Sequence, residues 1–414
     1  MIDSYLAALR EHLKTNQYSP KVAGRCLAVG EHFLQFLERR QVAIETAQPQ
    51  HVQAYLKEAR RIYRRTHGRI PANHAGWQCS HTSGVHMLLR VVQKQWPPKS
   101  SPTEPLQSFH IQICDAYAQW LMEFRGLATE TISDRRSLAL RLLGWLENRA
   151  SASRLADLAV SDIDAFVAAH ATCWRRVRRK GVALCLRSFL RYLHSQGLLK
   201  LDLSTSVVSP RVYEFEGIPS TLSADDVAAV LGVTRQDKSV KGRRDFAILM
   251  LLTTYGLRAG EITALRLEDI DWRREQVHIR HSKTGHETLL PLTKPVGEAL
   301  LSYLQKARPK VVSREIFIRV RAPYHPFRNG SSLYGCIVRR LIQAGVKWQG
   351  KHGPHAFRHA RAVTMLKAKV PSKVIGDVLG HRAAASTAVY LKLATDDLRN
   401  IALEVPEVMA CSAK

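Results

Sequence analysis

Side chains able to take part in phosphoryl transfer gather near the end of the sequence. His355 and Arg358 lie three residues apart in the stretch GPHAFRH, so on a helix they share one face. A second histidine, His381, follows a glycine typical of a helix C-terminus, and Tyr390 comes shortly after it. An imidazole can transfer protons, a guanidinium can bind phosphate oxygens and a phenol can act as a nucleophile.

Two further cations stand upstream, in expected turns. Arg258 lies in YGLRAGE, directly after an apolar helix predicted for residues 244–255. Lys283 lies in SKTG, the turn of a predicted β-hairpin with arms at 276–281 and 288–292. Taken singly, each residue has a commoner explanation, because an isolated tyrosine usually belongs to a core and an isolated cation usually lies at the surface. Only the combination indicates a site.

Two seams divide the sequence into three blocks. The first, residues 96–106, holds four prolines, and the second runs from residue 203 to residue 220. We expect helical domains at residues 1–97 and 106–205 and a third domain at 220–409. The expected fold class is mainly α with a small antiparallel β-hairpin in the third domain (α+β), and the N-terminal domains are expected to be helical.

The first two blocks read as copies of one helical unit. FLQFLERR, residues 33–40, is similar to LLGWLENR, residues 142–149. Downstream, Val52 and Tyr55 have counterparts in Ile163 and Phe166. Conserved order of this kind is typical of a duplication. Two unrelated amphipathic blocks can also be aligned in part, so both interpretations stay open.

The chain is strongly basic. Its 414 residues include 62 Lys+Arg against 35 Asp+Glu, a net charge of +27. A field of this strength favours a polyanionic partner, nucleic acid first and an anionic membrane surface second. A single exposed cation is usually only solvated, but dense clusters of one sign favour phosphate contacts. We expect DNA contacts from two such clusters: Arg60, Arg61, Arg64, Arg65; and Arg175, Arg176, Arg178, Arg179, Lys180.

Several other classes of protein are disfavoured. The sequence has no apolar run of about 18 residues that could span a membrane, and its start does not read as a secretory signal. The seven cysteines form no C-x-x-C pair, which favours reduced thiols in a cytosolic protein. Walker, Rossmann, HExxH and GxSxG motifs do not occur.

The stretches GLRAGEITALRLEDI, SKTGHETLLPL, HAFRH, VLGH and AVY resemble the tyrosine recombinase (phage integrase) family, in family order. The resemblance covers residues 258–390, with a family-like helical core-binding (SAM-like) domain from about residue 106. Residues 1–96 lie outside the usual two-domain pattern. The ending, from Tyr390 to Pro406, looks like a subgroup found in transposon-borne recombinases.

The resemblance implies a role for each residue. Arg258 and Arg358 would bind the nonbridging oxygens, and Tyr390 would attack phosphorus to give a 3′-phosphotyrosyl bond and a free 5′-hydroxyl. His355 would act as general base or acid beside the tyrosine. Lys283 would protonate the leaving oxygen and His381 would hydrogen-bond a nonbridging oxygen. Glu261 and His359 would hold the catalytic side chains in place without reacting themselves.

The resemblance therefore implies a site-specific recombinase that integrates, excises or transposes a mobile element without metal, ATP or cofactor. The expected partners are double-stranded DNA and further copies of the chain, as a tetramer on two DNA sites, or related recombinases. The expected location is the cytoplasm, at a bacterial-type nucleoid, without membrane contact. Two alternatives stay open: a DNA-binding accessory protein that does no chemistry, and a relaxing enzyme of the type IB topoisomerase kind.

Overall fold

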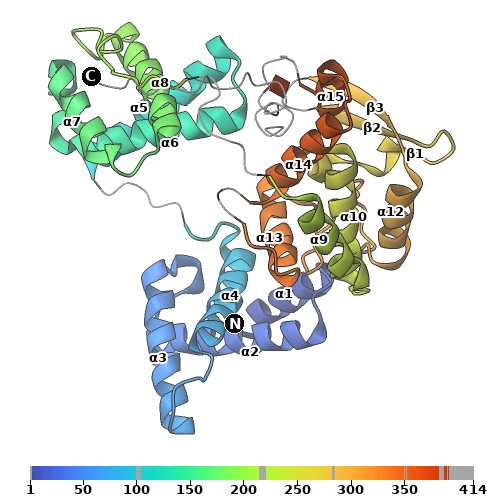
Figure 1. Ribbon diagram of the computed structural model, residues 1–414. Coiled ribbons are helices and arrows are strands. Elements are labelled where there is room, and N and C mark those ends of the chain that lie inside the picture. The colour runs from blue at the N-terminus through green and yellow to red at the C-terminus, as the bar shows by residue number, and fades with distance from the viewer. Residues whose placement is uncertain are drawn as a thin grey trace, which may run out of the picture. The chain divides into compact units, whose positions relative to one another are not determined.

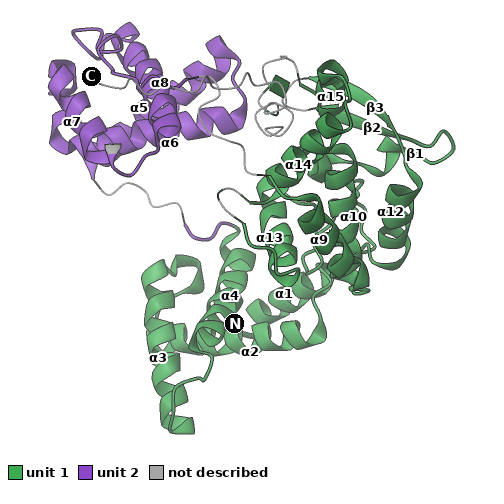
Figure 2. Cartoon of the chain, in the orientation of Figure 1, with its two compact units in different colours: residues 1–94, 217–414 green, residues 95–216 purple. Residues whose placement is uncertain are grey.

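The structure is a computed structural model. It describes residues 2–98, 104–213, 221–281, 285–348, 350, 352–381, 387, 388 and 390. The chain divides into two compact units, residues 1–94 with 217–414 and residues 95–216 (Figure 2). The described part is mainly helical with one small antiparallel sheet, which confirms the expected fold class (Figure 1).

The N-terminal residues form four helices: α1 (Ile2–Thr15), α2 (Pro20–Arg39), α3 (Pro49–His67) and α4 (His74–Gln93), with a 3₁₀ turn, η1 (Ile44–Thr46). Prolines open α2 and α3, where the missing N–H would have no helical partner. Gly68, with φ +65°, ends α3 in the left-handed conformation. Phe33, Phe36 and Tyr55 pack their rings together in the core of this block.

Residues 95–216 contain α5 (Pro105–Arg125), α6 (Thr129–Leu146), α7 (Val160–Ala171) and α8 (Arg176–Ser195), with two 3₁₀ turns, η2 (Glu147–Ala150) and η3 (Leu155–Asp157). The core is aromatic: Tyr117 packs against Phe189 and Tyr192, and its hydroxyl donates to Ser188 Oγ at 2.8 Å. Trp145 meets Phe166 edge to face. These contacts bury the apolar faces that the helical spacing predicts.

From residue 221 the chain forms α9 (Ala224–Gln236), α10 (Val240–Tyr255), α11 (Ala259–Ala264), α12 (Lys294–Lys306), α13 (Tyr334–Gln343), α14 (Pro354–Lys367) and α15 (Ser372–Leu379), with 3₁₀ turns η4 (Leu267–Asp269) and η5 (Gly330–Leu333). A capping box opens α9: Ser223 Oγ accepts from the Asp226 N–H, and the Asp226 carboxylate accepts from the Ser223 N–H. The helix α10 is buried along most of its length and packs against α9, α12 and α14. It is the central element of this region (Figure 1).

The sheet has the strand order β1 (Ile270–Asp271), β2 (Gln276–His281) and β3 (His286–Pro291), all antiparallel. Val277 pairs with Leu290 and Ile279 with Thr288, so the expected hairpin is confirmed, whereas β1 was not expected. Burial alternates along β2, which turns Val277, Ile279 and His281 inward. Among the described residues, no helix has the length and apolarity needed to cross a membrane.

Candidate active site

Arg258 is fixed at the start of α11 by Glu261. Its backbone N–H donates to Glu261 Oε2 and its Nη1 donates to Oε1, both at 2.7 Å. Its Nη2 donates to the carbonyl of Gly380 at 3.1 Å, which joins α11 to the end of α15. A planar cation held from two sides can bind phosphate oxygens with little rearrangement.

Glu261 is ionised although it is only 5% exposed. Burial raises the pKa of a carboxyl, but hydrogen bonds from His281 and from Arg258 outweigh it and lower the pKa of Glu261. The ionised carboxylate can therefore hold the Arg258 guanidinium throughout the neutral pH range.

Arg358 lies on α14 and is only 4% exposed. Its Nη1 donates to the carbonyl of Gly256 at 2.8 Å, and its Nη2 donates to the carbonyl of Leu379 at 2.5 Å. These carbonyls lie at the C-terminal ends of α10 and α15, where helices carry partial negative charge. Burial, followed by the charge of Arg258, lowers the pKa of Arg358, but a guanidinium remains charged at neutral pH.

Tyr390 reaches this cationic centre. Its ring is 4% exposed and packs in a small core with residues of α14 and α15. Its hydroxyl lies 3.3 Å from His359 Nδ1. Burial raises the pKa of the phenol, and the charge and hydrogen bond of Arg358 act against this rise. The structure thus brings the phenol and both arginines into one site.

The three histidines of the site differ in their surroundings. His359 contacts the phenol directly, whereas the exposed His355 lies one turn away, with the two imidazole centroids 6.4 Å apart. His381 stacks on Tyr390 with ring centroids 6.0 Å apart, and its Nδ1 lies 2.9 Å from Thr387 Oγ1. Burial, with Arg358 and Arg258 nearby, lowers the pKa of His381 to about 4, so its imidazole is neutral at pH 7.

Lys283 lies outside the described residues. Two positions before it, the sequence analysis missed His281, which is 1% exposed at the end of β2. His281 Nδ1 lies 2.7 Å from Glu261 Oε1 and Nε2 lies 3.0 Å from Thr288 Oγ1. The alternation of residues 276–281 was the available signal, because it places His281 on the same inner face as Val277 and Ile279.

The two basic clusters lie on other helices. Arg60, Arg61, Arg64 and Arg65 are exposed on α3. In the second unit, Arg175 caps α8 and the other four residues occupy its first turns. Of those four, only Arg179 is half-buried, with Nε donating to the carbonyl of Trp174 at 3.0 Å. Cations at a helix N-terminus oppose the helix dipole, so an anion bound there would be favourable.

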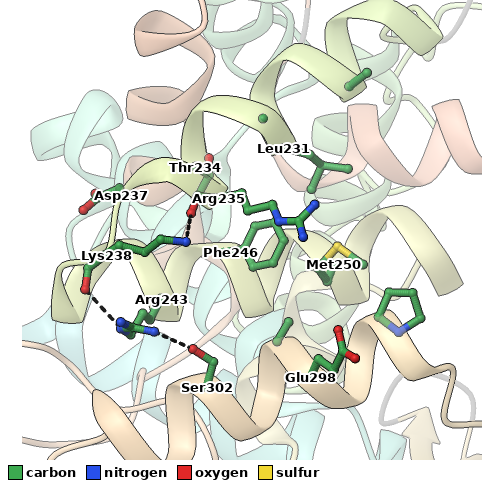
Figure 3. A pocket seen from close by; sticks show the side chains of 14 residues that line it. Leu231, Thr234, Arg235, Asp237, Lys238, Arg243, Phe246, Met250, Glu298 and Ser302 are labelled. Atoms are coloured by element: carbon green, nitrogen blue, oxygen red, sulfur yellow. Dashed lines mark hydrogen bonds between the residues drawn. The ribbon is translucent and has the colours of Figure 1, made fainter.

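A cavity of about 600 Å³ lies elsewhere, between α9, α10 and α12 (Figure 3). Arg243 crosses it, with Nη1 donating to Ser302 Oγ at 2.7 Å and Nε donating to the carbonyl of Lys238 at 3.0 Å. None of the expected catalytic residues lines this cavity. Across the described part of the chain, no group of three or more His, Cys, Asp or Glu residues is arranged to hold a metal ion.

Comparisons with known proteins fit this geometry. The phage integrase family pattern matches residues 220–396. A protein of Sinorhizobium fredii, y4gC, described as a candidate integrase/recombinase, is 59% identical over 189 residues, which cover 46% of this chain and 97% of that protein. A second from the same organism, y4rA, with the same description, is 35% identical over 297 residues, or 72% of this chain and 71% of that protein.

The fold is also shared with a solved structure. In a lambda integrase tetramer bound to a Holliday junction, the likeness covers 75% of this chain and 86% of that one, with a TM-score of 0.53 and 16% identity. Sequence relatives and fold thus agree. The chain belongs to the tyrosine recombinase (phage integrase) family and is a site-specific recombinase, an enzyme that breaks and rejoins DNA.

Proposed function

We propose that this recombinase cleaves DNA with Tyr390 and serves the integration, excision or transposition of a mobile element. The observation that carries the proposal is the placement of the Tyr390 phenol. It lies against Arg358 and His359, with His381 stacked on its ring. Arg358 and His359 lie on α14, and Arg358 joins this helix to the C-terminal ends of α10 and α15 by donating to the carbonyls of Gly256 and Leu379.

The chemistry balances without an external cofactor. The phenol oxygen bonds to phosphorus, the bond from phosphorus to the 5′ oxygen breaks, and the DNA 3′ end becomes a phosphotyrosine. The phenol proton passes to His355, and Lys283 gives a proton to the leaving 5′ oxygen. Rejoining is the reverse step, and the energy of the broken bond is kept in the phosphotyrosine.

Charge stabilisation comes from the protein itself. Negative charge grows on the phosphoryl oxygens during the attack, and the guanidinium groups of Arg258 and Arg358 bind those oxygens. His381, neutral at pH 7, adds a hydrogen bond rather than a charge. Glu261 holds Arg258 in place and does not touch the DNA.

DNA binding must uncover the phenol. Tyr390 is only 4% exposed, and His359 holds its hydroxyl in the DNA-free chain. His355 is on the exposed side of the same helix, where a phosphate can reach it. We therefore assign His359 to the resting contact with Tyr390 and His355 to proton transfer once DNA is bound.

The basic clusters supply the DNA contacts. On α3, Lys57, Arg60, Arg61 and Arg64 line a groove of about 630 Å³ together with Ile70 and His74. The residues that line this groove include no carboxylate, so it suits a phosphate backbone. The cluster at the start of α8 has the same character, and we assign both surfaces to double-stranded DNA.

Each of the first two blocks carries one basic surface, and the third block carries the candidate active site. We therefore propose a DNA-binding domain at 1–97, a core-binding domain at 106–205 and a catalytic domain at 220–409. Residues aligned between the first two are buried in both, Tyr55 at 3% and Phe166 at 0% exposed, which supports a duplication. Strand exchange needs several cleavages, so we propose a tetramer on two DNA sites, or a mixed assembly with related recombinases, acting at the nucleoid in a bacterial cytoplasm.

Trapping of the covalent intermediate tests the proposal. The full-length protein is incubated with fragments of the DNA that flanks its gene, denatured, and the attached DNA is sequenced to give the cleavage site. A nicked duplex that carries this site loses a short cleaved strand and so accumulates the adduct. We expect adducts with the wild-type protein and with Tyr334→Phe, an exposed control tyrosine, but none with Tyr390→Phe, which should still bind the duplex.

Excess EDTA gives the second arm of this experiment. Because the proposed chemistry uses only protein cations, adduct formation should continue at an unchanged rate. Adducts formed by Tyr390→Phe would remove Tyr390 from the reaction. Cleavage that stops in EDTA and returns with Mg²⁺ would replace the proposed chemistry with metal-dependent cleavage.

A further inference from the structure

His281 touches both groups that hold Arg258. Its Nδ1 lies 2.7 Å from Glu261 Oε1, the same oxygen that accepts from Arg258 Nη1 at 2.7 Å. Its ring also packs on Gly380, whose carbonyl accepts from Arg258 Nη2 at 3.1 Å. One buried imidazole therefore contacts both partners of the guanidinium.

The contact with Gly380 is close. A Cβ added at Gly380 would lie 2.5 Å from His281 Cε1 and 2.6 Å from Nδ1, distances that real Cβ atoms do not adopt. Gly380 has φ +64°, so glycine here serves both the left-handed end of α15 and the space for the imidazole. The next residue is His381, so the ring also supports the turn that presents His381.

The geometry points to His281 as a positioning residue of the recombinase. Its Nδ1–H donates to the carboxylate of Glu261 and thereby orients Arg258, while its ring seats the Gly380 turn. It lies too deep to touch DNA, at 1% exposed, so it acts through Arg258 and His381. The inference rests on the proposed role of Arg258 at the phosphate.

The chemistry of the carboxylate explains why this donor matters. Glu261 is buried and accepts three hydrogen bonds, from the Arg258 backbone, from Arg258 Nη1 and from His281. Without the imidazole, Oε1 loses a hydrogen-bond partner in a buried site, and the carboxylate can rotate and carry the guanidinium with it. A displacement of about 1 Å in a catalytic group can lower a rate by about 10²-fold.

Two substitutions separate the contacts of the imidazole. The amide nitrogen of asparagine can occupy the place of Nδ1, and that of glutamine the place of Nε2. His281→Asn therefore keeps a donor to Glu261, whereas His281→Gln keeps only the contact with Thr288. Thr288→Val is the matched control, because it removes the Nε2 contact and leaves Nδ1 in place.

The rate of covalent adduct formation on the nicked duplex is measured for each variant, together with DNA affinity and thermal unfolding. We expect Thr288→Val to cleave at nearly the wild-type rate and His281→Gln to cleave about 10²-fold more slowly with unchanged affinity. The rate of His281→Asn should lie between these two, because asparagine keeps the donor to Glu261 but loses the ring that packs on Gly380. Equal rates for the asparagine and glutamine variants would overturn the assignment.

A measurement on the unaltered protein covers the case in which a variant fails to fold. In ¹⁵N-histidine NMR of the wild-type chain, the His281 signal should show a proton on Nδ1, and an unprotonated Nδ1 would contradict the proposal. Failure of the proposed function is distinguishable, because it would show as adducts with Tyr390→Phe, whatever the His281 results.

Discussion

At the scale of single residues, the site holds its cations with neutral carbonyls and one carboxylate. Arg358 donates to two helix-end carbonyls, and Arg258 donates to Glu261 and to the carbonyl of Gly380. Among the described residues, one carboxylate, that of Glu261, is present for the two guanidinium groups of the site, and it pairs with Arg258. The site therefore retains positive charge for the phosphodiester, and burial together with this charge lowers the pKa of His381 and keeps its imidazole neutral.

The neutral state of His381 predicts a pH dependence of stability. Its pKa falls from the ordinary value of 6.5 to about 4 on folding, so the unfolded chain binds a proton more readily. The contribution to stability is complete above pH 6.5 and is lost as the pH falls toward 4. The free energy of unfolding, measured with urea at pH 7 and at pH 5, should fall less between these pH values for His381→Gln than for the wild-type protein. An equal fall for both proteins would contradict the low pKa of His381.

At the scale of elements, helix ends converge on the site. Gly256 ends α10 and Gly380 ends α15, and both adopt the left-handed conformation, with φ of +66° and +64°. Their turns expose carbonyl groups that accept from Arg358 and Arg258. The sheet contributes its inner face at the end of β2, where His281 meets Glu261.

We expect Gly380→Ala to destabilise the catalytic region by more than the cost of placing an alanine in the left-handed conformation. Gly345 is the matched control, because its φ of +67° is similar and an added Cβ would meet nothing within 4 Å. We expect Gly345→Ala to lower the free energy of unfolding by about 1 kcal/mol. Gly380→Ala should lower it further and also slow adduct formation, because the His281 ring must move. Equal unfolding free energies for the two variants would mean that the ring contact has no energetic weight.

At the scale of the whole molecule, the net charge is +27, and the exposed arginines differ in whether a carboxylate lies beside them. On α3, Arg60 and Arg64 line the groove without a carboxylate. Nearby, Arg39 and Arg40 both pair with Glu58, at 3.0 Å and 3.3 Å. Two pairs of arginines with the same formal charge can therefore be compared, one that lines the groove and one that pairs with a carboxylate.

This difference predicts the salt dependence of DNA binding. Arg60→Ala with Arg64→Ala should weaken binding to a duplex and reduce the slope of log affinity against log salt by about 0.9 for each lost phosphate contact. Arg39→Ala with Arg40→Ala removes the same formal charge and should change the slope less. Equal slopes for the two double variants, measured by fluorescence anisotropy at several salt concentrations, would exclude the groove as a phosphate-binding surface.

Much of this protein could be read from the sequence, because the decisive signals are local. The motifs around Arg258, Arg358 and Tyr390 identified the family, and alternation predicted the pairing of β2 with β3. Helix ends were marked by glycine, as at Gly256 and Gly380, because few other residues adopt a positive φ without strain.

Only the tertiary structure decided which side chains meet. The contact of His281 with Gly380 and the contact of His359 with the Tyr390 hydroxyl depend on how α14, α15 and β2 pack. A sequence records spacing along one element, whereas these contacts join segments that are far apart in the chain. Packing sets them to within an ångström, and hydrogen bonding and electrostatics act at that distance.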